Sequence, residues 1–149
     1  MTAVDANRDV ARTALERVCP RGDMVLARDC YAEDFSDHVG ALEFHGHDGI
    51  HRSTALYRAL FDDLAIDVVD QIADGDRVAN RWILTGTNRG RRIRLPGLTL
   101  SRLHDGRIVE DWTAFDTLDL LGALGPRRTL LAAPRLLHAL RATRSRPTT

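Results

Sequence analysis

The sequence predicts an α+β domain in which helices gather on one face of a curved antiparallel sheet. Apolar residues recur at helical spacing in three segments of the first 64 residues, and from residue 65 onward they alternate with period two. Three turn sequences then follow one another: Asp74-Gly75-Asp76, Asn88-Arg89-Gly90 and His104-Asp105-Gly106. Such turns join antiparallel neighbours, so they predict a meander of about four strands. Helices followed along the chain by an antiparallel meander define the α+β class.

Three helices are expected in the N-terminal half. The first covers residues 5–18, with Asp5 as a candidate N-cap, and it ends before Pro20-Arg21-Gly22. Asp23 can cap a second, short helix. The third covers residues 50–64 and has a continuous apolar face. The polar stretch AEDFSDHVG at residues 32–40 is typical of a loop.

The strands are expected at residues 65–73, 77–88, 93–104 and 108–116. Pro96-Gly97 predicts a kink or bulge in the third of them. A short helix should then end at Gly125. We therefore expect a folded domain at residues 1–125 and a separate basic segment at 126–149, which contains six Arg and no acidic residue. This segment is expected to form a surface helix and a frayed tail. A helix bound to a membrane or to nucleic acid is the alternative.

Composition excludes several classes of protein. The formal net charge is zero, which gives no reason to expect a nucleic-acid partner. No apolar run approaches the ~20 residues that span a bilayer, and the first residues carry charges throughout, so we expect a cytoplasmic protein without a signal peptide or membrane segment. Cys19 and Cys30 are too few for a disulfide framework or a four-cysteine zinc site.

The last predicted strand carries the first candidate for chemistry. Strict alternation would place five of its residues on one face: Ile108, Glu110, Trp112, Ala114 and Asp116. If that face lines a pocket, burial raises the pKa of Asp116 and makes it a better proton acceptor near neutral pH. Asp116 also stands directly before a predicted helix, where Asp is a preferred N-cap. The residues alone leave both roles open.

Polar and aromatic side chains elsewhere are candidate ligand contacts. His38, in the predicted loop, could stabilise an oxyanion or shuttle a proton, or could bond only to backbone. Asn80 and Trp82 share a strand face and are a candidate polar anchor and pocket wall, with Trp112 as a second aromatic wall. Tyr31 and Tyr57 should face the sheet, either as core residues or as contacts to a ligand.

The segment FHGHDGIH contains His45, His47 and His51. Such spacing could hold a metal ion. Gly46 and Gly49 favour a structural loop instead, with His47 at the mouth of the pocket, and we expect no metal. Neither a G-x-S-x-G elbow nor a P-loop nor a dinucleotide fingerprint is present in the sequence. Serine-hydrolase and nucleotide chemistry are therefore disfavoured.

Four segments in order carry a family resemblance: YAEDFSDHVG, GHDGI with LYRALFDDL, GDRVANRWILTGTNRG and DGRIVEDWTAFD. Over residues 10–125 the chain resembles the SnoaL-like polyketide cyclases of the nuclear transport factor 2-like superfamily. The resemblance implies a cone-shaped sheet around a deep pocket, often dimerised through the outer face of the sheet, and no metal. It also implies that Asp116, after the tryptophan, is the general base, and that His38 belongs to the site.

These expectations define a function to be tested. The leading hypothesis is a cofactor-independent cyclase that closes a ring in a hydrophobic, polyketide-like substrate by an intramolecular aldol reaction, with Asp116 as base and His38 and Asn80 stabilising the oxyanion. Epoxide opening on the same scaffold and non-catalytic binding of a small molecule are the alternatives. A homodimer is expected through outer-face apolar residues, for which the candidates are Ala79, Ile83, Val109 and Phe115.

Overall fold

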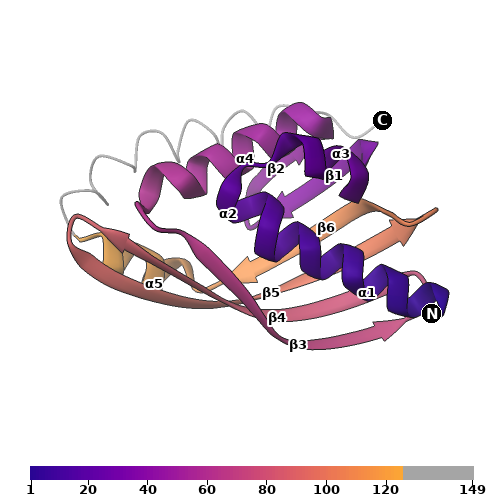
Figure 1. Ribbon diagram of the computed structural model, residues 1–149. Coiled ribbons are helices and arrows are strands. Elements are labelled where there is room, and N and C mark those ends of the chain that lie inside the picture. Colours follow the sequence, from indigo (N-terminus) through magenta and orange to yellow (C-terminus); the bar gives the residue numbers. More distant parts are fainter. Residues whose placement is uncertain (126–149) are drawn as a thin grey trace.

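A computed structural model describes residues 1–125, and the predicted basic helix and tail at 126–149 lie outside the described residues. Helices occupy most of the first half and strands most of the second (Figure 1). The helical elements are α1 (Ala3–Thr13), η1 (Ala14–Val18), α2 (Cys19–Arg21), α3 (Met24–Cys30), α4 (Gly46–Leu60) and α5 (Thr117–Leu124). The strands are β1 (Tyr31–Val39), β2 (Leu42–His45), β3 (Ala65–Asp74), β4 (Arg77–Asn88), β5 (Arg91–His104) and β6 (Arg107–Phe115).

Helices α1, η1 and α2 form one continuous helical rod. Its N-cap is Thr2 and not Asp5, because the Thr2 hydroxyl accepts from the Asp5 N–H at 3.1 Å while the Asp5 carboxylate accepts from the Thr2 N–H at 3.0 Å. This reciprocal pair satisfies backbone donors that the first helical turn leaves free. Gly22, at φ 63°, ends the rod in the left-handed conformation that glycine adopts without strain. Asp23 caps α3 as predicted, accepting from the Leu26 N–H at 3.0 Å.

The sheet has six strands in the order β2-β1-β6-β5-β4-β3. The predicted antiparallel meander is confirmed for β3 to β6. The sheet as a whole is mixed, because β1, which adds to the meander, pairs with β6 in parallel and with β2 in an antiparallel arrangement. The predicted loop at residues 32–40 is therefore mostly a strand. The segment does not look like a strand in the sequence because most of its residues are polar and few side chains, such as Phe35, are buried in the core.

Three irregularities interrupt the sheet, and none lies at Pro96-Gly97, where the β4–β5 register continues unbroken. One lies in the β1–β6 pairing between Tyr31 and Ser36, and one interrupts β3 between Val68 and Asp70. The third lies in β6, where Arg102 opposes Glu110 and Leu103 opposes Ile108, so that Val109 is an extra residue. A bulge of this kind reverses which side chains face inward on its two sides.

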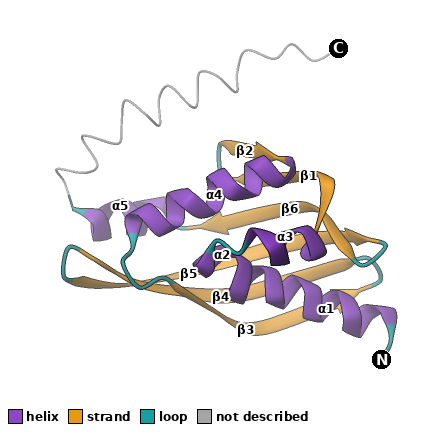
Figure 2. Ribbon diagram, turned by 45° about the horizontal axis from the view of Figure 1, so that its top comes forward, coloured by secondary structure: helices purple, strands orange, loops and turns teal. Residues whose placement is uncertain are grey.

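The helices cover one face of the sheet (Figure 2). Helix α1 packs against β3 and β4, and α4 packs against β1 and β2. Two apolar clusters fill the space between the layers, one centred on Val18, Phe35 and Ile108 and the other on Trp82 and Leu95. The sheet is open, since β2 and β3 are its edges.

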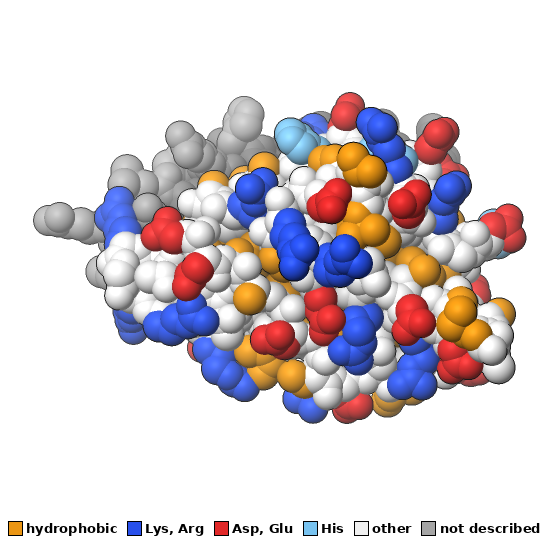
Figure 3. Space-filling view, viewed as in Figure 1, with side chains coloured by type: hydrophobic (Ala, Val, Ile, Leu, Met, Phe, Trp, Pro, Cys, Tyr) orange, Lys and Arg blue, Asp and Glu red, His pale blue; other side chains and the backbone are white. Residues whose placement is uncertain are grey.

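Charges of both signs are intermingled over the surface seen in Figure 3, with no large patch of one sign. In the part of the chain that the structure describes, no helix is long and apolar enough to cross a membrane.

Candidate functional site

A cavity lies between the inner face of the sheet and the helices, and it contains about 530 Å³ of empty space including its mouth. Aliphatic and aromatic side chains form most of the wall, and a few polar groups converge on it. The lining residues are Leu15, Cys19, Tyr31, Phe35, Asp37, Val39, Ile50, Ser53, Thr54, Tyr57, Ile66, Trp82, Leu84, Thr99, Asp111 and Thr113.

The bulge at Val109 decides which face of β6 lines this cavity. Ile108 is fully buried before the bulge, and after it Asp111 and Thr113 face inward while Trp112 faces out. The predicted common face of Ile108, Trp112 and Asp116 is therefore wrong. Unbroken alternation would hold only without the extra residue.

Two carboxylates face the cavity from neighbouring strands. Asp37 of β1 lies directly opposite Asp111 of β6 in the parallel register, where strands are roughly 4.8 Å apart. Burial raises the pKa of Asp37 to about 7, against a smaller opposing effect of the His38 charge. Burial also raises the pKa of Asp111 well above its usual value, and the charge of Asp37 raises it further. Burial thus favours the protonated form of both carboxyl groups.

The two predicted tyrosine contacts are in the site. Tyr31 and Tyr57 both line the cavity, and Tyr31 packs edge-on against Phe35 with ring centroids 4.6 Å apart. Burial raises the pKa of both phenols, so both hydroxyls stay protonated. They are neutral groups beside the carboxylate pair.

Trp82, also predicted as a pocket wall, lines the cavity and is 2% exposed. Its indole Nε1–H donates to the Thr99 hydroxyl at 2.9 Å, and the Thr99 and Thr113 hydroxyls lie 3.0 Å apart. Gly97 opposite Trp82 makes room for the ring, because a Cβ at Gly97 would overlap it.

Asp116 lies outside the cavity. It is exposed and caps α5, where its carboxylate accepts from the Leu118 N–H at 2.8 Å and from the Asp119 N–H at 3.2 Å. Of the two roles that the sequence left open, the structure shows capping.

His38 and Trp112 also lie away from the cavity, on the outer face of the sheet. Their rings stack with centroids 5.6 Å apart, and His38 Nε2 lies 3.0 Å from Glu110 Oε1. Trp112 is 38% exposed. The expected roles of His38 at an oxyanion and of Trp112 as a pocket wall do not fit these positions, because both residues alternate with inward-facing neighbours, Asp37 and Asp111.

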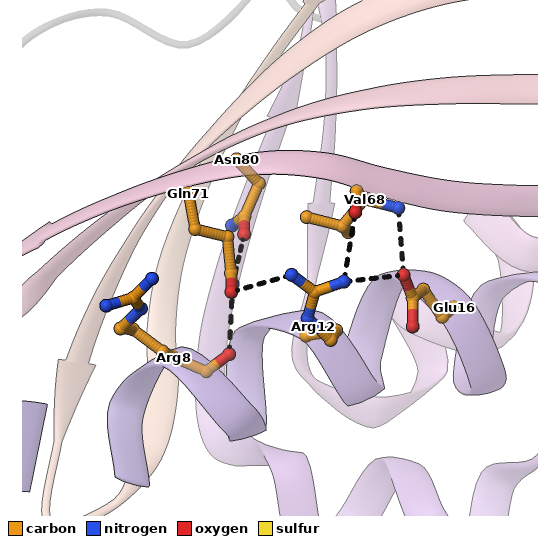
Figure 4. A network of polar contacts seen from close by, with 6 residues as sticks. All are labelled: Arg8, Arg12, Glu16, Val68, Gln71 and Asn80. Atoms are coloured by element: carbon orange, nitrogen blue, oxygen red, sulfur yellow. Dashed lines mark hydrogen bonds and ion pairs between the residues drawn. The ribbon is translucent and has the colours of Figure 1, made fainter. Parts of the chain in front are cut away.

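Asn80 faces inward but is covered by α1 (Figure 4). The Arg12 guanidinium can only donate hydrogen bonds, and it donates to Gln71 Oε1 at 3.1 Å. The amide nitrogen of Gln71 therefore donates to Asn80 Oδ1, at 2.7 Å. This order directs Asn80 Nδ2 into the interior, where it has no partner among the described residues. Asn80 is absent from the cavity wall, so the structure supports a packing role and not the predicted anchor.

His47 lies in the first turn of α4, beside an open polar recess that also contains Arg28, Glu33 and Arg107. Its Nε2 lies 3.1 Å from the carbonyl oxygen of Tyr31, so it joins α4 to the start of β1. Within residues 1–125, no three His, Cys, Asp or Glu side chains come together as metal ligands.

Sequence reasoning missed Asp37, Asp111 and Thr113. Asp37 lies in the segment interpreted as a loop, and Asp111 precedes Trp112 on what unbroken alternation makes the outer face. A signal for Asp37 was present: apolar Phe35 and Val39 lie two residues on either side of it, and in a half-buried strand all three share one face. The Val109 bulge has no comparable signal.

Comparison with known proteins agrees with this architecture. The family model of the SnoaL-like polyketide cyclases matches residues 9–124. Wild-type IdmH of Streptomyces antibioticus, a proposed polyketide cyclase, is 29% identical over 80% of this chain and 99% of its own, with a TM-score of 0.69. A proposed polyketide cyclase of Bacillus cereus is 25% identical over 80% of both chains, with a TM-score of 0.73.

A protein of Catenulispora acidiphila with a ketosteroid isomerase-like fold is 19% identical over 80% of this chain and 92% of its own, with a TM-score of 0.66, and it supports the fold alone. No curated protein matches the chain by sequence. These neighbours and the family match support a cyclase-type function in general. With the match covering residues 9–124, the chain belongs to the SnoaL-like polyketide cyclase family, within the nuclear transport factor 2-like superfamily.

Proposed function

We propose that the protein is a cofactor-independent cyclase that closes a ring in a hydrophobic, polyketide-like substrate by acid–base chemistry, with Asp37 as the base. The observation that carries the proposal is the carboxylate pair on opposed positions of β1 and β6, facing an apolar cavity. A general base works best when its pKa lies near the working pH, and burial raises that of Asp37 to about 7.

The reaction begins when Asp37 removes a proton from a carbon next to a carbonyl group. The resulting enolate carbon attacks a second carbonyl carbon of the same chain, and the new alkoxide takes a proton. Asp111, whose protonated form burial favours, is the acid that donates to a developing oxyanion. Apolar walls such as Phe35, Ile50 and Leu84 fold the flexible substrate so that the two reacting carbons meet.

The same pair also suits epoxide opening, because Asp111 can protonate the epoxide oxygen while Asp37 deprotonates the attacking hydroxyl. Both reactions need one charged and one neutral carboxyl group. They therefore share the prediction that Asp37 and Asp111 are essential, and the choice of substrate separates them.

The test uses intramolecular aldol closure of 2,6-heptanedione as a minimal probe. We expect Asp37→Asn to lower the rate by ~10²-fold or more, because it removes the proton acceptor and keeps the shape. Asp34→Asn is the matched control, since Asp34 is an exposed carboxylate on the same strand.

Asp116→Asn separates the proposal from the sequence-based prediction. We expect it to retain its rate, because Asn is also a good N-cap. If Asp116→Asn is inactive while Asp37→Asn turns over normally, Asp37 is not the base. If the wild type binds cyclic ketones but never turns over an aldol or epoxide probe, the protein is a binding protein.

A further inference from the structure

A row of hydrogen-bonded side chains crosses three strands at the floor of the cavity. It joins Trp82 of β4, Thr99 of β5 and Thr113 of β6 through contacts of 2.9 and 3.0 Å. All three residues line the cavity, and Thr99 is 2% exposed. Thr99 lies directly opposite Thr113 in the β5–β6 register, so the backbone holds the two hydroxyls together.

The direction of these bonds follows from the chemistry of the first residue. An indole N–H can only donate, so Thr99 must accept from Trp82. Among the described residues, Trp82 and Thr113 are the only side chains within hydrogen-bond distance of the Thr99 hydroxyl. A buried hydroxyl proton needs an acceptor, so Thr99 donates to Thr113. The proton of Thr113 is then left without a partner within residues 1–125.

We propose that the Thr113 hydroxyl is a hydrogen-bond donor for a ketone or enolate oxygen of the substrate, and that Trp82 and Thr99 are the positioning residues that fix its direction. Thr113 is only partly buried and stands on the cavity wall, so its free proton can reach a bound molecule. Donors aligned in a chain polarise one another, which strengthens the last one.

The position of Thr113 fits the proposed function, on which this inference rests. Thr113 and Asp111 are two residues apart on the same face of β6, which separates their Cα atoms by roughly 7 Å. One oxygen of a dicarbonyl substrate can therefore meet Thr113 while Asp111 and Asp37 act at the other. Thr113 would recognise an acceptor oxygen and would not favour a hydrocarbon or an ammonium group.

The first test compares binding of 1-tetralone and tetralin, two probes that differ by one carbonyl oxygen, by calorimetry. We expect the wild type to prefer the ketone and Thr113→Val to lose about fivefold in ketone affinity while tetralin binding stays unchanged. Val has nearly the shape of Thr and suits a strand, so the cavity should persist. Thr113→Ser restores the hydroxyl and should restore the preference.

The second test reads the hydrogen bond directly, through the infrared carbonyl stretch of bound ¹³C-labelled 1-tetralone. The band should lie at lower frequency in the wild type and in Thr113→Ser than in Thr113→Val. Thr99→Val and Trp82→Phe should shift it part of the way, since they remove the alignment but leave the Thr113 hydroxyl. A purely structural role of Thr99 or Trp82 would not move this band.

Three outcomes overturn the inference: equal ketone preference in wild type and Thr113→Val, a carbonyl band that none of the variants moves, or a wild type that binds the ketone no more tightly than tetralin. None of these measurements needs turnover. A protein without cyclase activity that still discriminates the ketone through Thr113 therefore refutes the proposed function and keeps the donor role.

Discussion

At the scale of single residues, the cavity depends on two carboxyl groups whose pKa values burial raises, and this has a consequence for stability. Below about pH 4 Asp37 is protonated in both the folded and the unfolded chain. As the pH rises toward 7, the unfolded chain loses this proton while the folded one, with a pKa of about 7, keeps it. The folded state then binds more protons, so its free energy of unfolding falls with rising pH.

Asp37→Asn removes this penalty. We expect the variant to be more stable than the wild type at pH 8 by ~1–3 kcal/mol and to match it near pH 4. Chemical denaturation at both pH values measures the difference, with Asp34→Asn as the exposed control. An Asp37→Asn variant that is less stable at pH 8 would show that the ionised carboxylate has partners that compensate its burial.

The same pKa predicts a pH profile for the proposed activity. The rate should rise through about pH 7 as Asp37 loses its proton, and it should fall at higher pH once Asp111 ionises. Measuring kcat/KM with 2,6-heptanedione across this range checks it. A flat profile between pH 5 and 9 would exclude Asp37 as the rate-controlling base.

Residue chemistry in the site could be predicted only in part. Tyr31, Tyr57 and Trp82 line the cavity as predicted. Two arguments favour Asp116 as the base: period-two alternation extended through β6, and the family resemblance. One extra residue at Val109 exchanges the two faces of the strand and removes the first argument. Bulges depend on contacts with the partner strand, which a single sequence does not show.

Gly97 shows how strictly one position is constrained. Its φ needs no glycine, but any Cβ would overlap the ring of Trp82 on the opposed strand. We expect Gly97→Ala to lower the free energy of unfolding by ~1–3 kcal/mol, as overpacking does, and to displace Trp82 from Thr99. Gly122→Ala, in α5 with open space around it, is the matched control and should be neutral or slightly stabilising. Thermal melts of both variants measure the change in stability.

At the scale of elements, the π-helical turn η1 joins the helical layer to β3. Glu16 Oε1 accepts from the backbone N–H of Val68 at 2.8 Å and from Arg12 at 3.1 Å, beside the β3 irregularity (Figure 4). Arg12 also donates to the Val68 carbonyl oxygen at 2.9 Å. The pair thus satisfies backbone groups that the interrupted strand leaves available. Leu15 of η1 and Cys19 at the start of α2 line the cavity.

Replacing Glu16 tests this junction. Glu16→Ala leaves the Val68 N–H without its acceptor and should cost ~1–3 kcal/mol of stability, whereas Glu16→Gln keeps an acceptor and should cost less than half as much. Asp9→Ala, an exposed acid on α1, is the control for loss of a helical carboxylate. Equal losses for Glu16→Ala and Glu16→Gln would mean that the charge matters and the bond to Val68 does not.

The elements that could be predicted are those marked by residues close together in the sequence. The β3–β6 meander is marked by its turns, and α3 by its cap at Asp23. Strand β1 was missed because its parallel partner, β6, follows only after β2, α4, β3, β4 and β5. Pairing over such distances leaves little trace in composition.

At the scale of the whole molecule, the outer face of the sheet carries a row of apolar side chains that no described element covers. The strand register places one residue of this row on each strand of the meander: Ile72 on β3, Ala79 on β4, Leu100 on β5 and Trp112 on β6. The row ends at His38 of β1. Ile72 is 73% exposed, and Leu98, next on this face of β5, is 55% exposed. Of the interface candidates that the sequence offered, Ala79 and Ile83 share this face, whereas Phe115 packs inward beside Trp82 with centroids 6.5 Å apart.

A contiguous apolar row on an open sheet favours a partner, and a second copy of the chain can offer the same row to it about a two-fold axis. We therefore expect a homodimer at micromolar concentration, measured by light scattering after size exclusion. Leu98→Glu and Trp112→Glu should each weaken it by about 30-fold, because they place a charge in the centre of the contact. Val25→Glu is the control, since Val25 is 78% exposed on α3 and belongs to the helical layer. A wild type that stays monomeric at 100 µM, or a dimer that both outer-face variants preserve, would contradict this assembly and leave the apolar row for another contact.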